Sequence, residues 1–163
     1  MTKIKTAGPL HVTWMILRDG DRVLLAHKKI SFGKGYINGI GGKVDPGETF
    51  EQAAVRETEE EICVKVTRYE KVATIIMDDL VFKGIRRQTI MHCYIGYDWE
   101  GEPTETYEMK PEWFQIDRVP YDKMWVDDQF WLPQVLAGEK IKARFKFNDD
   151  YEILEHTVTI LPR

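Results

Sequence analysis

The sequence predicts one α/β (α+β) domain in which mixed β-strands are layered against two helices. A chain of 163 residues suits one compact domain and leaves little room for two. Apolar runs rich in β-branched residues recur between turn signals, which is typical of strands. Two segments, near residues 50–62 and 128–140, carry helix formers and interrupt the strands. We find no linker or repeat, so we expect residues 1–163 to form a single domain.

Turn residues set the bounds of the predicted strands. The Asp-Gly pair at 19–20 is a strong hairpin signal, and the Lys-Gly pair at 83–84 marks a second turn. Residues 29–47 contain six glycines and are predicted to be loops. A polar loop is expected at 101–111 and a last turn at 148–150. The strands are predicted at residues 11–18, 22–28, 64–77, 85–97, 112–116, 141–147 and 151–160.

Both helix starts carry local signals. Thr49 and Gln52, three residues later, form a capping-box pattern, and no glycine or proline interrupts residues 50–62. The second helix is expected to begin near residue 127, with Asp127 or Asp128 as its N-cap.

Six glutamates lie between residues 48 and 61, and this crowding needs a physical explanation. Glu57, Glu60 and Glu61 stand at i, i+3 and i+4, so they project from one helix face and repel one another. A charge run alone is more often a solvated face. The alternative is a hard divalent cation, because Mg²⁺ takes carboxylate oxygens and keeps substrate phosphates among its other ligands.

The other charges of this segment are interpreted differently. Arg56 lies eight residues after Glu48, and a pair between them would tie the preceding loop to the helix. Glu51 and Glu59 lie off the shared face and are expected to face water.

Composition argues against several classes of protein. The net charge of −4 and the pI of about 5.6 disfavour a binder of duplex nucleic acid, which would present a basic face. We expect no membrane partner, because no apolar run is long enough to span a bilayer and no signal-peptide core precedes the domain. Cys63 and Cys93 form no C-x-x-C pair and are expected to be free thiols. We therefore expect a cytoplasmic protein, and a monomer.

The stretch from Gly42 to Val64 resembles the signature of the Nudix hydrolase family. That signature is Gly, five residues, Glu, seven residues, Arg-Glu, an aliphatic residue, one residue, Glu-Glu, one residue, Gly and an aliphatic residue. The matching residues here are Gly42, Glu48, Arg56, Glu57, Glu60, Glu61 and Val64. Thr58 replaces the first aliphatic residue, and Cys63 replaces the second glycine. So many matches at fixed spacing are far more specific than a lone short motif.

The resemblance implies a fold, a reaction and a cofactor. The fold would be a curved mixed sheet between helices. The reaction would be hydrolysis of a nucleoside diphosphate linked to another moiety. The cofactor would be Mg²⁺, with Mn²⁺ as the alternative. The implied metal ligands are Gly42, Glu57, Glu60 and Glu61, while Arg56 and Glu48 complete the catalytic motif. The general base would be a box glutamate or a distant one, for which Glu108 is the candidate, although Glu108 by itself reads as an exposed loop residue.

Segments outside the box resemble one branch of the family. Residues 27–49, 108–133 and 143–158 are similar to the oxidised-purine nucleoside triphosphatases of the mammalian MutT-homologue type. Those enzymes convert 8-oxo-dGTP and related nucleotides to the monophosphate and pyrophosphate, so the implied partner is a nucleoside triphosphate substrate. The residues that would line the base pocket are Thr13, Lys28, Phe32, Asn38, Trp125, Asp127, Asp128 and Trp131.

Each pocket residue also has a plainer interpretation. The aspartate pair is by itself more often a helix cap, tryptophans are usually core residues, and Asn38-Gly39 is commonly a turn. Their joint order and spacing favour a base pocket. In such a pocket adjacent carboxylates repel, so one keeps its proton and donates while the other accepts.

The chain departs from the pattern at three places. Ile37 stands where that branch has tryptophan. Residues 78–88 form a longer loop than the matching loop of that branch, with three basic side chains, Lys83, Arg86 and Arg87. These side chains would contact phosphates, contact a different base, or simply be solvated at the tip of a hairpin. Cys63 is expected to change the helix end slightly, because a left-handed end costs a cysteine about 1 kcal/mol.

Three functions therefore stay open. The first is hydrolysis of oxidised purine nucleoside triphosphates. The second is hydrolysis of another nucleotide, such as a dinucleotide polyphosphate or an ordinary dNTP. The third is a non-catalytic nucleotide-sensing module, which the retained Glu57, Glu60 and Glu61 disfavour.

Overall fold

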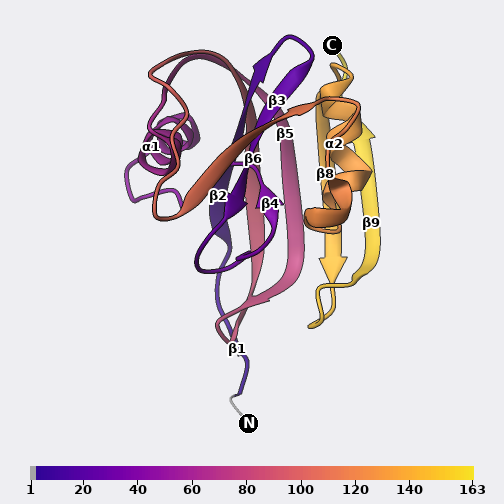
Figure 1. Cartoon of the computed structure of the whole chain (residues 1–163). Coiled ribbons are helices and arrows are strands. Elements are labelled where there is room, and N and C mark those ends of the chain that lie inside the picture. Colours follow the sequence, from indigo (N-terminus) through magenta and orange to yellow (C-terminus); the bar gives the residue numbers. More distant parts are fainter. Residues whose placement is uncertain (1–2) are drawn as a thin grey trace.

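One mixed β-sheet with a helix against each face forms the protein (Figure 1). The computed structural model describes residues 3–163, and within them nine strands run in the order β4-β3-β2-β6-β5-β8-β9, with β1 beside β6 and β7 beside β3. The pairs β1–β6, β2–β6 and β5–β8 are parallel, and the other pairs are antiparallel. The elements are β1 (Lys5–Thr6), β2 (Leu10–Asp19), β3 (Arg22–Lys28), β4 (Ile37–Asn38), α1 (Phe50–Ile62), β5 (Lys65–Phe82), β6 (Ile85–Glu100), β7 (Met109–Gln115), the short 3₁₀ helix η1 (Tyr121–Lys123), α2 (Asp128–Leu136), β8 (Ile141–Phe147) and β9 (Ile153–Ile160).

The alternation of side chains along β2 explains why the sheet has a core on each face. Successive strand residues point to opposite faces. Trp14 and Ile16 join the apolar cluster that includes α2, whereas Met15 and Leu17 join the cluster under α1. All four side chains are at most 2% exposed. A strand buried on both faces needs this continuous apolar run, and the sequence of β2 supplies it.

The start of α1 follows its local sequence, as predicted. Thr49 Oγ1 accepts from the Gln52 N–H at 3.0 Å, and Gln52 Oε1 accepts from the Thr49 N–H at 2.9 Å, so the capping box is confirmed. Ala53, Ala54 and Ile62 are buried against the sheet. The expectation for Glu51 is wrong, because the Tyr94 hydroxyl donates to its carboxylate at 3.0 Å instead of leaving it to water.

The end of α1 contradicts the expected change at Cys63. Cys63 has φ 64° and ψ 27°, the left-handed conformation that a glycine would adopt, and its N–H donates to the Glu59 carbonyl at 3.0 Å. The chain reverses here into β5, and the Cys63 carbonyl packs against Gly101, where an added Cβ would lie 2.8 Å away. The fold therefore imposes the left-handed helix end on a residue that pays a steric cost for it.

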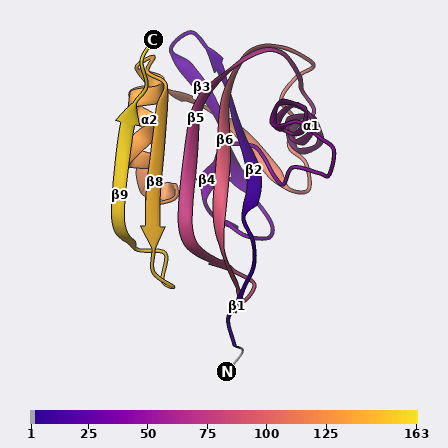
Figure 2. The same cartoon turned by 180° about the vertical axis from the view of Figure 1, so that it is seen from behind.

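The segment 78–88 is a strand hairpin rather than a loop. β5 continues to Phe82 and β6 starts at Ile85, with a register shift between Met77 and Leu80. The predicted turn is confirmed, because Lys83 and Gly84 both have positive φ, at 50° and 73°. Figure 2 shows this long hairpin reaching down to β1, on the side of the sheet where β5, β8 and β9 carry no helix in front of them.

Other element bounds differ by a few residues. β7 begins at residue 109 rather than 112, because it pairs with β3 over the whole length of both strands. The end of the expected polar loop therefore belongs to the sheet. α2 ends at residue 136 rather than near 140, and β4 lies within the glycine-rich segment. Cys63 and Cys93 are free thiols, as expected. Among the described residues no helix combines the length and the apolar character needed to cross a membrane.

Candidate active site

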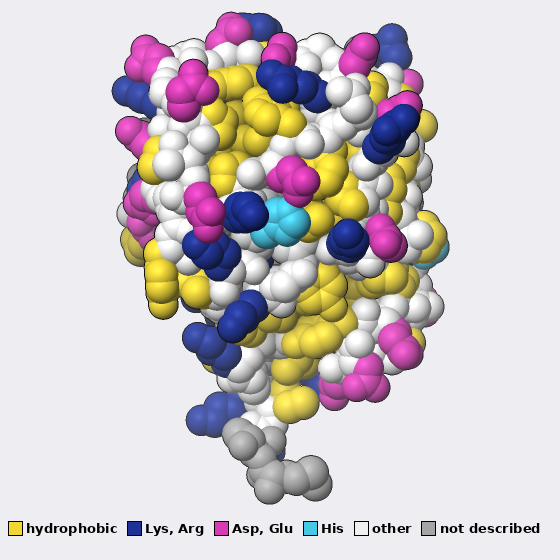
Figure 3. Space-filling view, viewed as in Figure 1, with side chains coloured by type: hydrophobic (Ala, Val, Ile, Leu, Met, Phe, Trp, Pro, Cys, Tyr) yellow, Lys and Arg dark blue, Asp and Glu magenta, His cyan; other side chains and the backbone are white. Residues whose placement is uncertain are grey.

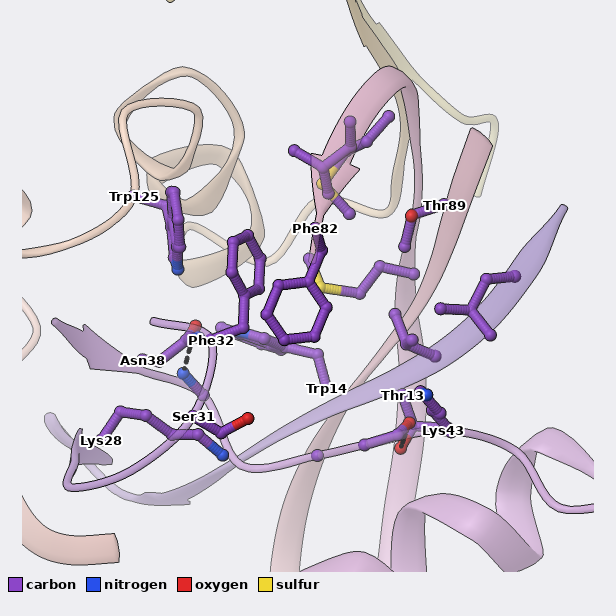
Figure 4. A pocket seen from close by; sticks show the side chains of 18 of the residues that line it. Thr13, Trp14, Lys28, Ser31, Phe32, Asn38, Lys43, Phe82, Thr89 and Trp125 are labelled. Carbon is purple, nitrogen blue, oxygen red and sulfur yellow. Dashed lines mark hydrogen bonds between the residues drawn. The ribbon is translucent and has the colours of Figure 1, made fainter. Parts of the chain in front are cut away.

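A cavity of about 380 Å³ lies between the β4 loop, the β5–β6 hairpin and the start of α2 (Figure 4). Seven of the eight residues predicted for the base pocket line it, and the glycine pair that opens the Nudix-like signature lines its other end. The lining residues among those predicted are Thr13, Lys28, Phe32, Asn38, Trp125, Asp127 and Asp128, together with Gly42. The fold thus brings predicted pocket residues from β2, the β4 loop and the start of α2 to one site.

Trp131 lies behind the cavity wall rather than on it. Its side chain is fully buried in the α2 core, and its Nε1–H donates to Asp127 Oδ2 at 3.1 Å. The indole therefore holds the Asp127 carboxylate in place. Any influence of Trp131 on a bound base acts through that carboxylate.

The aspartate pair is one of the least exposed polar groups of the protein. Asp127 and Asp128 are 4% and 2% exposed. Burial raises the pKa of both carboxyls, and the neighbouring Asp127 raises the pKa of Asp128 further. Asp127 occupies the N-cap position of α2, but its side chain makes no capping bond, so the helix-cap interpretation does not explain the pair. A shared proton is the arrangement that this environment favours.

Aromatic side chains wall the cavity. The rings of Phe32 and Phe82 have centroids 4.4 Å apart, and Phe32 lies 5.0 Å from Trp125. Tyr36 stacks on Trp125 at 4.5 Å with an interplanar angle of 8°. Figure 3 shows hydrophobic patches in both the upper and the lower half of this face, and the lower patch has basic side chains to its left and acidic ones at the lower right. Such a lining suits a flat apolar ring with polar edges.

Asn38 is oriented by its own backbone. Its Oδ1 accepts from the Gly39 N–H at 3.0 Å, which fixes the carboxamide at the rim of the β4 loop (Figure 4). The turn interpretation of Asn38-Gly39 is wrong, because Asn38 ends strand β4 and pairs with Ala26 of β3, and it is this strand end that presents the side chain to the cavity.

Arg56 ties the acidic face of α1 together. Its Nε and Nη2 donate to Glu48 at 2.6 and 2.9 Å, which confirms the predicted pair between helix and loop. Its Nη1 donates to Glu57 at 3.0 Å and to Glu60 at 3.1 Å. The guanidinium bond lowers the pKa of Glu48. One cation thus compensates three carboxylates.

The three glutamates among the four predicted metal ligands differ in exposure. Glu61 is 3% exposed, the Glu57 side chain is 15% exposed and the Glu60 side chain is 58% exposed. Burial raises the pKa of Glu61 to about 8; Lys28 opposes this shift, and the carboxylates of Glu57 and Glu108 add to it. Burial also raises the pKa of Glu57, against the effect of Arg56. The fold therefore brings the distant candidate Glu108 beside the helix.

The donor set fits a hard divalent cation. All the groups are oxygen donors, and their mutual repulsion and raised pKa values are what a cation would relieve. The Glu57 carboxyl group packs so closely against Gly42 that an added Cβ would lie 2.6 Å from its carboxyl carbon, so only glycine fits at this position. Among residues 3–163, no three side chains of His, Cys, Asp or Glu are close enough together to bind one metal ion. The carboxylates of Glu57 and Glu60 are hydrogen-bonded to Arg56 instead.

Sequence reasoning missed part of the cavity wall. Trp14, Phe82, Thr89 and Met91 also line it, and so do Lys83 and Arg87 of the suspected hairpin. A signal was present in β6, because Arg87, Thr89 and Met91 alternate and must share a face. Arg86 points to the other face and pairs with Asp149 at 2.9 Å. Of the three basic residues, two therefore reach the cavity.

Comparison with known proteins identifies the family of this chain. The family pattern described as NUDIX domain matches residues 9–135, which is most of the chain. The chain belongs to the Nudix hydrolase family. It is similar to the oxidized purine nucleoside triphosphate hydrolase of Danio rerio, with 41% identity over 145 residues covering 89% of this chain and 91% of that protein. The protein of the same name from Mus musculus is 39% identical over 146 residues, covering 90% and 92%.

A solved Nudix structure shows the same fold. The MutT protein of Bacillus halodurans is 26% identical, with a TM-score of 0.79 over 91% of this chain and 97% of that one. The predicted mixed α/β Nudix architecture is therefore confirmed. Nudix hydrolases in general need a divalent metal.

One departure from the Nudix signature has a structural explanation. Thr58 stands at an aliphatic position and is fully buried. Its hydroxyl donates to the Ala54 carbonyl at 2.7 Å, one helical turn earlier. The polar atom is satisfied within the helix, so Thr58 fills the core position without an unpaired group.

Proposed function

We propose that this enzyme hydrolyses oxidised purine nucleoside triphosphates, such as 8-oxo-dGTP, to the monophosphate and pyrophosphate. One observation carries the proposal: a single cavity joins Asn38 and the buried Asp127–Asp128 pair at one end to Gly42 at the other, where Glu57 begins the acidic face. A purine at the aspartate end would direct its triphosphate toward α1. The two similar vertebrate proteins are named for this activity.

The residues divide into a recognition end and a reaction end. At the recognition end Asn38 supplies both a donor and an acceptor, and the aspartates supply one of each when they share a proton. At the reaction end we assign Glu57, Glu60 and Glu61, with Gly42, to a divalent cation, which we take to be Mg²⁺. When bound, that cation supplies positive charge against the phosphate oxygens.

The chain's own groups then govern charge and proton transfer. Lys28 lines the cavity beside Glu61 and offers a further positive charge to the triphosphate. Glu61, whose pKa burial raises to about 8, is suited to take the proton of an attacking water, and Glu108 beside it is the second candidate base. Arg56 and Glu48 keep the loop of Gly42 in register with the helix.

The proposal is tested by pyrophosphate release with Mg²⁺ from 8-oxo-dGTP, 2-hydroxy-dATP, dGTP, dATP and a dinucleotide polyphosphate. We expect the oxidised purines to be preferred in kcat/KM. Preference for dGTP over 8-oxo-dGTP would end the assignment to oxidised purines. Preference for the dinucleotide would favour the alternative substrate, for which Lys83 and Arg87 at the cavity wall offer cations.

We further infer that the enzyme acts as a monomer in the cytoplasm and does not bind duplex nucleic acid. The cavity and the acidic face are both built from one chain, so no second copy is needed to complete them. The net charge of −4 disfavours a duplex partner. Sedimentation of the purified chain, alone and with a DNA duplex, tests the monomeric state and the lack of duplex binding, and imaging of the tagged protein in cells tests the compartment.

A further inference from the structure

The indole N–H of Trp14 is a buried donor without a partner. Three buried side-chain N or O atoms of the described chain lack a hydrogen bond: Trp14 Nε1, Asp128 Oδ2 and Gln134 Oε1. Trp14 is 2% exposed. Buried tryptophans usually find a partner for this N–H, and a buried donor left unpaired lowers stability. Such an atom in a folded protein calls for an explanation.

Two of these three atoms belong to one cavity. Trp14 and Asp128 both line it, whereas Gln134 does not. One atom is a donor and the other belongs to a carboxyl group, so together they match a ligand with an acceptor and a donor along its edge. Figure 4 shows Trp14 in the wall beneath Phe32, beside Asn38. The unpaired groups therefore coincide with the end of the cavity that is assigned to the base.

A second tryptophan nearby shows what a purely structural indole does. Trp131 packs edge-on against Trp14, with ring centroids 5.2 Å apart and an interplanar angle of 68°. Trp131 is also buried, but its N–H is bonded to Asp127 at 3.1 Å. Two indoles thus share one environment, and only Trp131 is paired within the protein.

The β4 loop is shaped around the nitrogen edge of Trp14. A Cβ at Gly39 would lie 2.2 Å from Trp14 Nε1, so the loop needs a glycine at that point. Gly39 follows Asn38, whose carboxamide it orients. The loop that presents the predicted base-reading residue therefore passes directly over the unpaired donor.

We propose that Trp14 is a specificity-determining residue whose indole N–H donates a hydrogen bond to an acceptor atom of the bound purine base. The proposal rests on the proposed function, because it takes the aspartate end of the cavity as the base site. Nε1 lies buried beneath the β4 loop, so an acceptor of the base reaches it only when the loop at Gly39 shifts, and the bond formed there competes with no solvent bond. A nucleotide whose base lacks an acceptor at that place leaves the donor unpaired and binds more weakly.

The first experiment observes the donor directly in the wild-type chain. Its five tryptophans give five indole N–H signals in a ¹⁵N spectrum, and the Trp14 signal is assigned through its own backbone amide. 8-oxo-dGMP is then added without divalent cation. We expect the Trp14 indole proton to move downfield as the bond forms, while the signal of Trp113, on the α1 face, stays in place. A Trp14 signal that moves no more than that of Trp113 overturns the proposal.

The second experiment measures catalysis. Trp14→Phe keeps an aromatic ring and removes the donor, and we expect a loss of roughly tenfold or more in kcat/KM for 8-oxo-dGTP, carried mainly by KM. The melting temperature should fall by several degrees, because the smaller ring leaves a cavity beside Trp131, so kcat/KM is compared at a temperature where both proteins are folded. Trp113→Phe is the matched control and should keep full kcat/KM. Unchanged kcat/KM in Trp14→Phe overturns the proposal, and if that variant does not fold, the wild-type spectrum decides.

The two experiments separate this inference from the proposed function. If the wild-type enzyme releases no pyrophosphate from any oxidised purine but the Trp14 signal moves with a purine monophosphate, the function fails and the role of Trp14 stands. If the enzyme is active on 8-oxo-dGTP and the Trp14 signal stays in place, the function stands and the role of Trp14 fails.

Discussion

Two groups of acidic side chains serve this enzyme, and they differ in how their charge is compensated. On α1, Glu57 and Glu60 receive hydrogen bonds from the guanidinium of Arg56, and Glu60 is open to solvent. At the start of α2, Asp127 and Asp128 are buried, and the partner of Asp127 is the neutral indole of Trp131. We therefore propose that the first group depends on cations and the second on a proton.

The difference shows that environment, not residue type, assigns the role of a carboxyl group. On α1, burial raises the pKa of Glu57 and Glu61, and a bound metal would supply the positive charge that keeps both carboxylates ionised. A carboxyl in an apolar pocket beside a second one keeps its proton and becomes a hydrogen-bond donor. Each assignment can be broken by a substitution that removes charge but keeps shape.

The largest effect is expected at the cation-dependent group. Glu60→Gln removes one of the charges assigned to the metal, and we expect turnover to fall by about two orders of magnitude or more. Pyrophosphate release from 8-oxo-dGTP at saturating Mg²⁺ measures it. Glu59→Gln is the matched control, because Glu59 is an exposed neighbour off the shared face, and it should keep near-normal turnover. A near-normal rate in Glu60→Gln would remove Glu60 from the site.

At the proton-dependent group the same kind of change should alter selectivity instead. Asp128→Asn fixes a donor that cannot ionise, so the pair loses its ability to exchange donor and acceptor roles. We expect the ratio of kcat/KM for 8-oxo-dGTP and 2-hydroxy-dATP to change by about 10- to 100-fold. Asp127→Asn should also shift this ratio. Equal losses on all nucleotides would contradict a base-reading role.

The local part of both groups could be predicted from the sequence. The spacing of Glu57, Glu60 and Glu61 placed them on one helix, and Thr49 with Gln52 fixed where that helix begins. Helix caps and hairpin turns depend on residues a few positions apart, so a sequence shows them directly. The same holds for Arg56 and Glu48, which lie eight residues apart.

The remaining features depend on contacts between distant segments. Glu108 approaches Glu61 only because β7 pairs with β3 along its full length. From the sequence alone, Trp14 is interpreted as an ordinary core residue. Only the structure shows that Gly39, after β4, packs against its indole nitrogen. Cys63 takes a left-handed conformation against its own preference because the chain must turn into β5. In each case tertiary structure overrides the local preference.

A buried basic cluster under the start of α1 extends the comparison to the opposite charge. His92 is 5% exposed; Lys71 Nζ lies 2.9 Å from its Nδ1, and His11 Nδ1 lies 2.9 Å from its Nε2. The ring of Phe50 stacks on His92 with centroids 3.6 Å apart. Burial, followed by Lys71 and His11, lowers the pKa of His92 to about 4, against a smaller opposite effect of Glu51.

This pKa predicts a loss of stability in acid. Below its ordinary pKa, near 6.5, His92 takes up a proton in the unfolded chain but not in the folded one. The free energy of unfolding should therefore fall by about 2 to 3 kcal/mol between pH 6.5 and 4 from this group alone. Denaturant unfolding across that range measures it. His92→Gln should flatten the slope, whereas His156→Gln, at an exposed position, should not. An equal slope in all three proteins would contradict the assignment.

The smallest effect is expected at the other end of the acidic helix. Cys63 is exposed and has φ 64°, and its backbone N–H donates to the Glu59 carbonyl. Cys63→Gly should raise the free energy of unfolding by about 1 kcal/mol, because glycine adopts this conformation without a Cβ clash. Turnover should change by less than about twofold, since backbone strain two residues beyond Glu61 is already present in the active conformation. Cys63→Ala separates the two causes: it removes the thiol and keeps the Cβ, so it should not raise stability. A large gain in turnover for Cys63→Gly would show instead that the helix end governs the cation-dependent group.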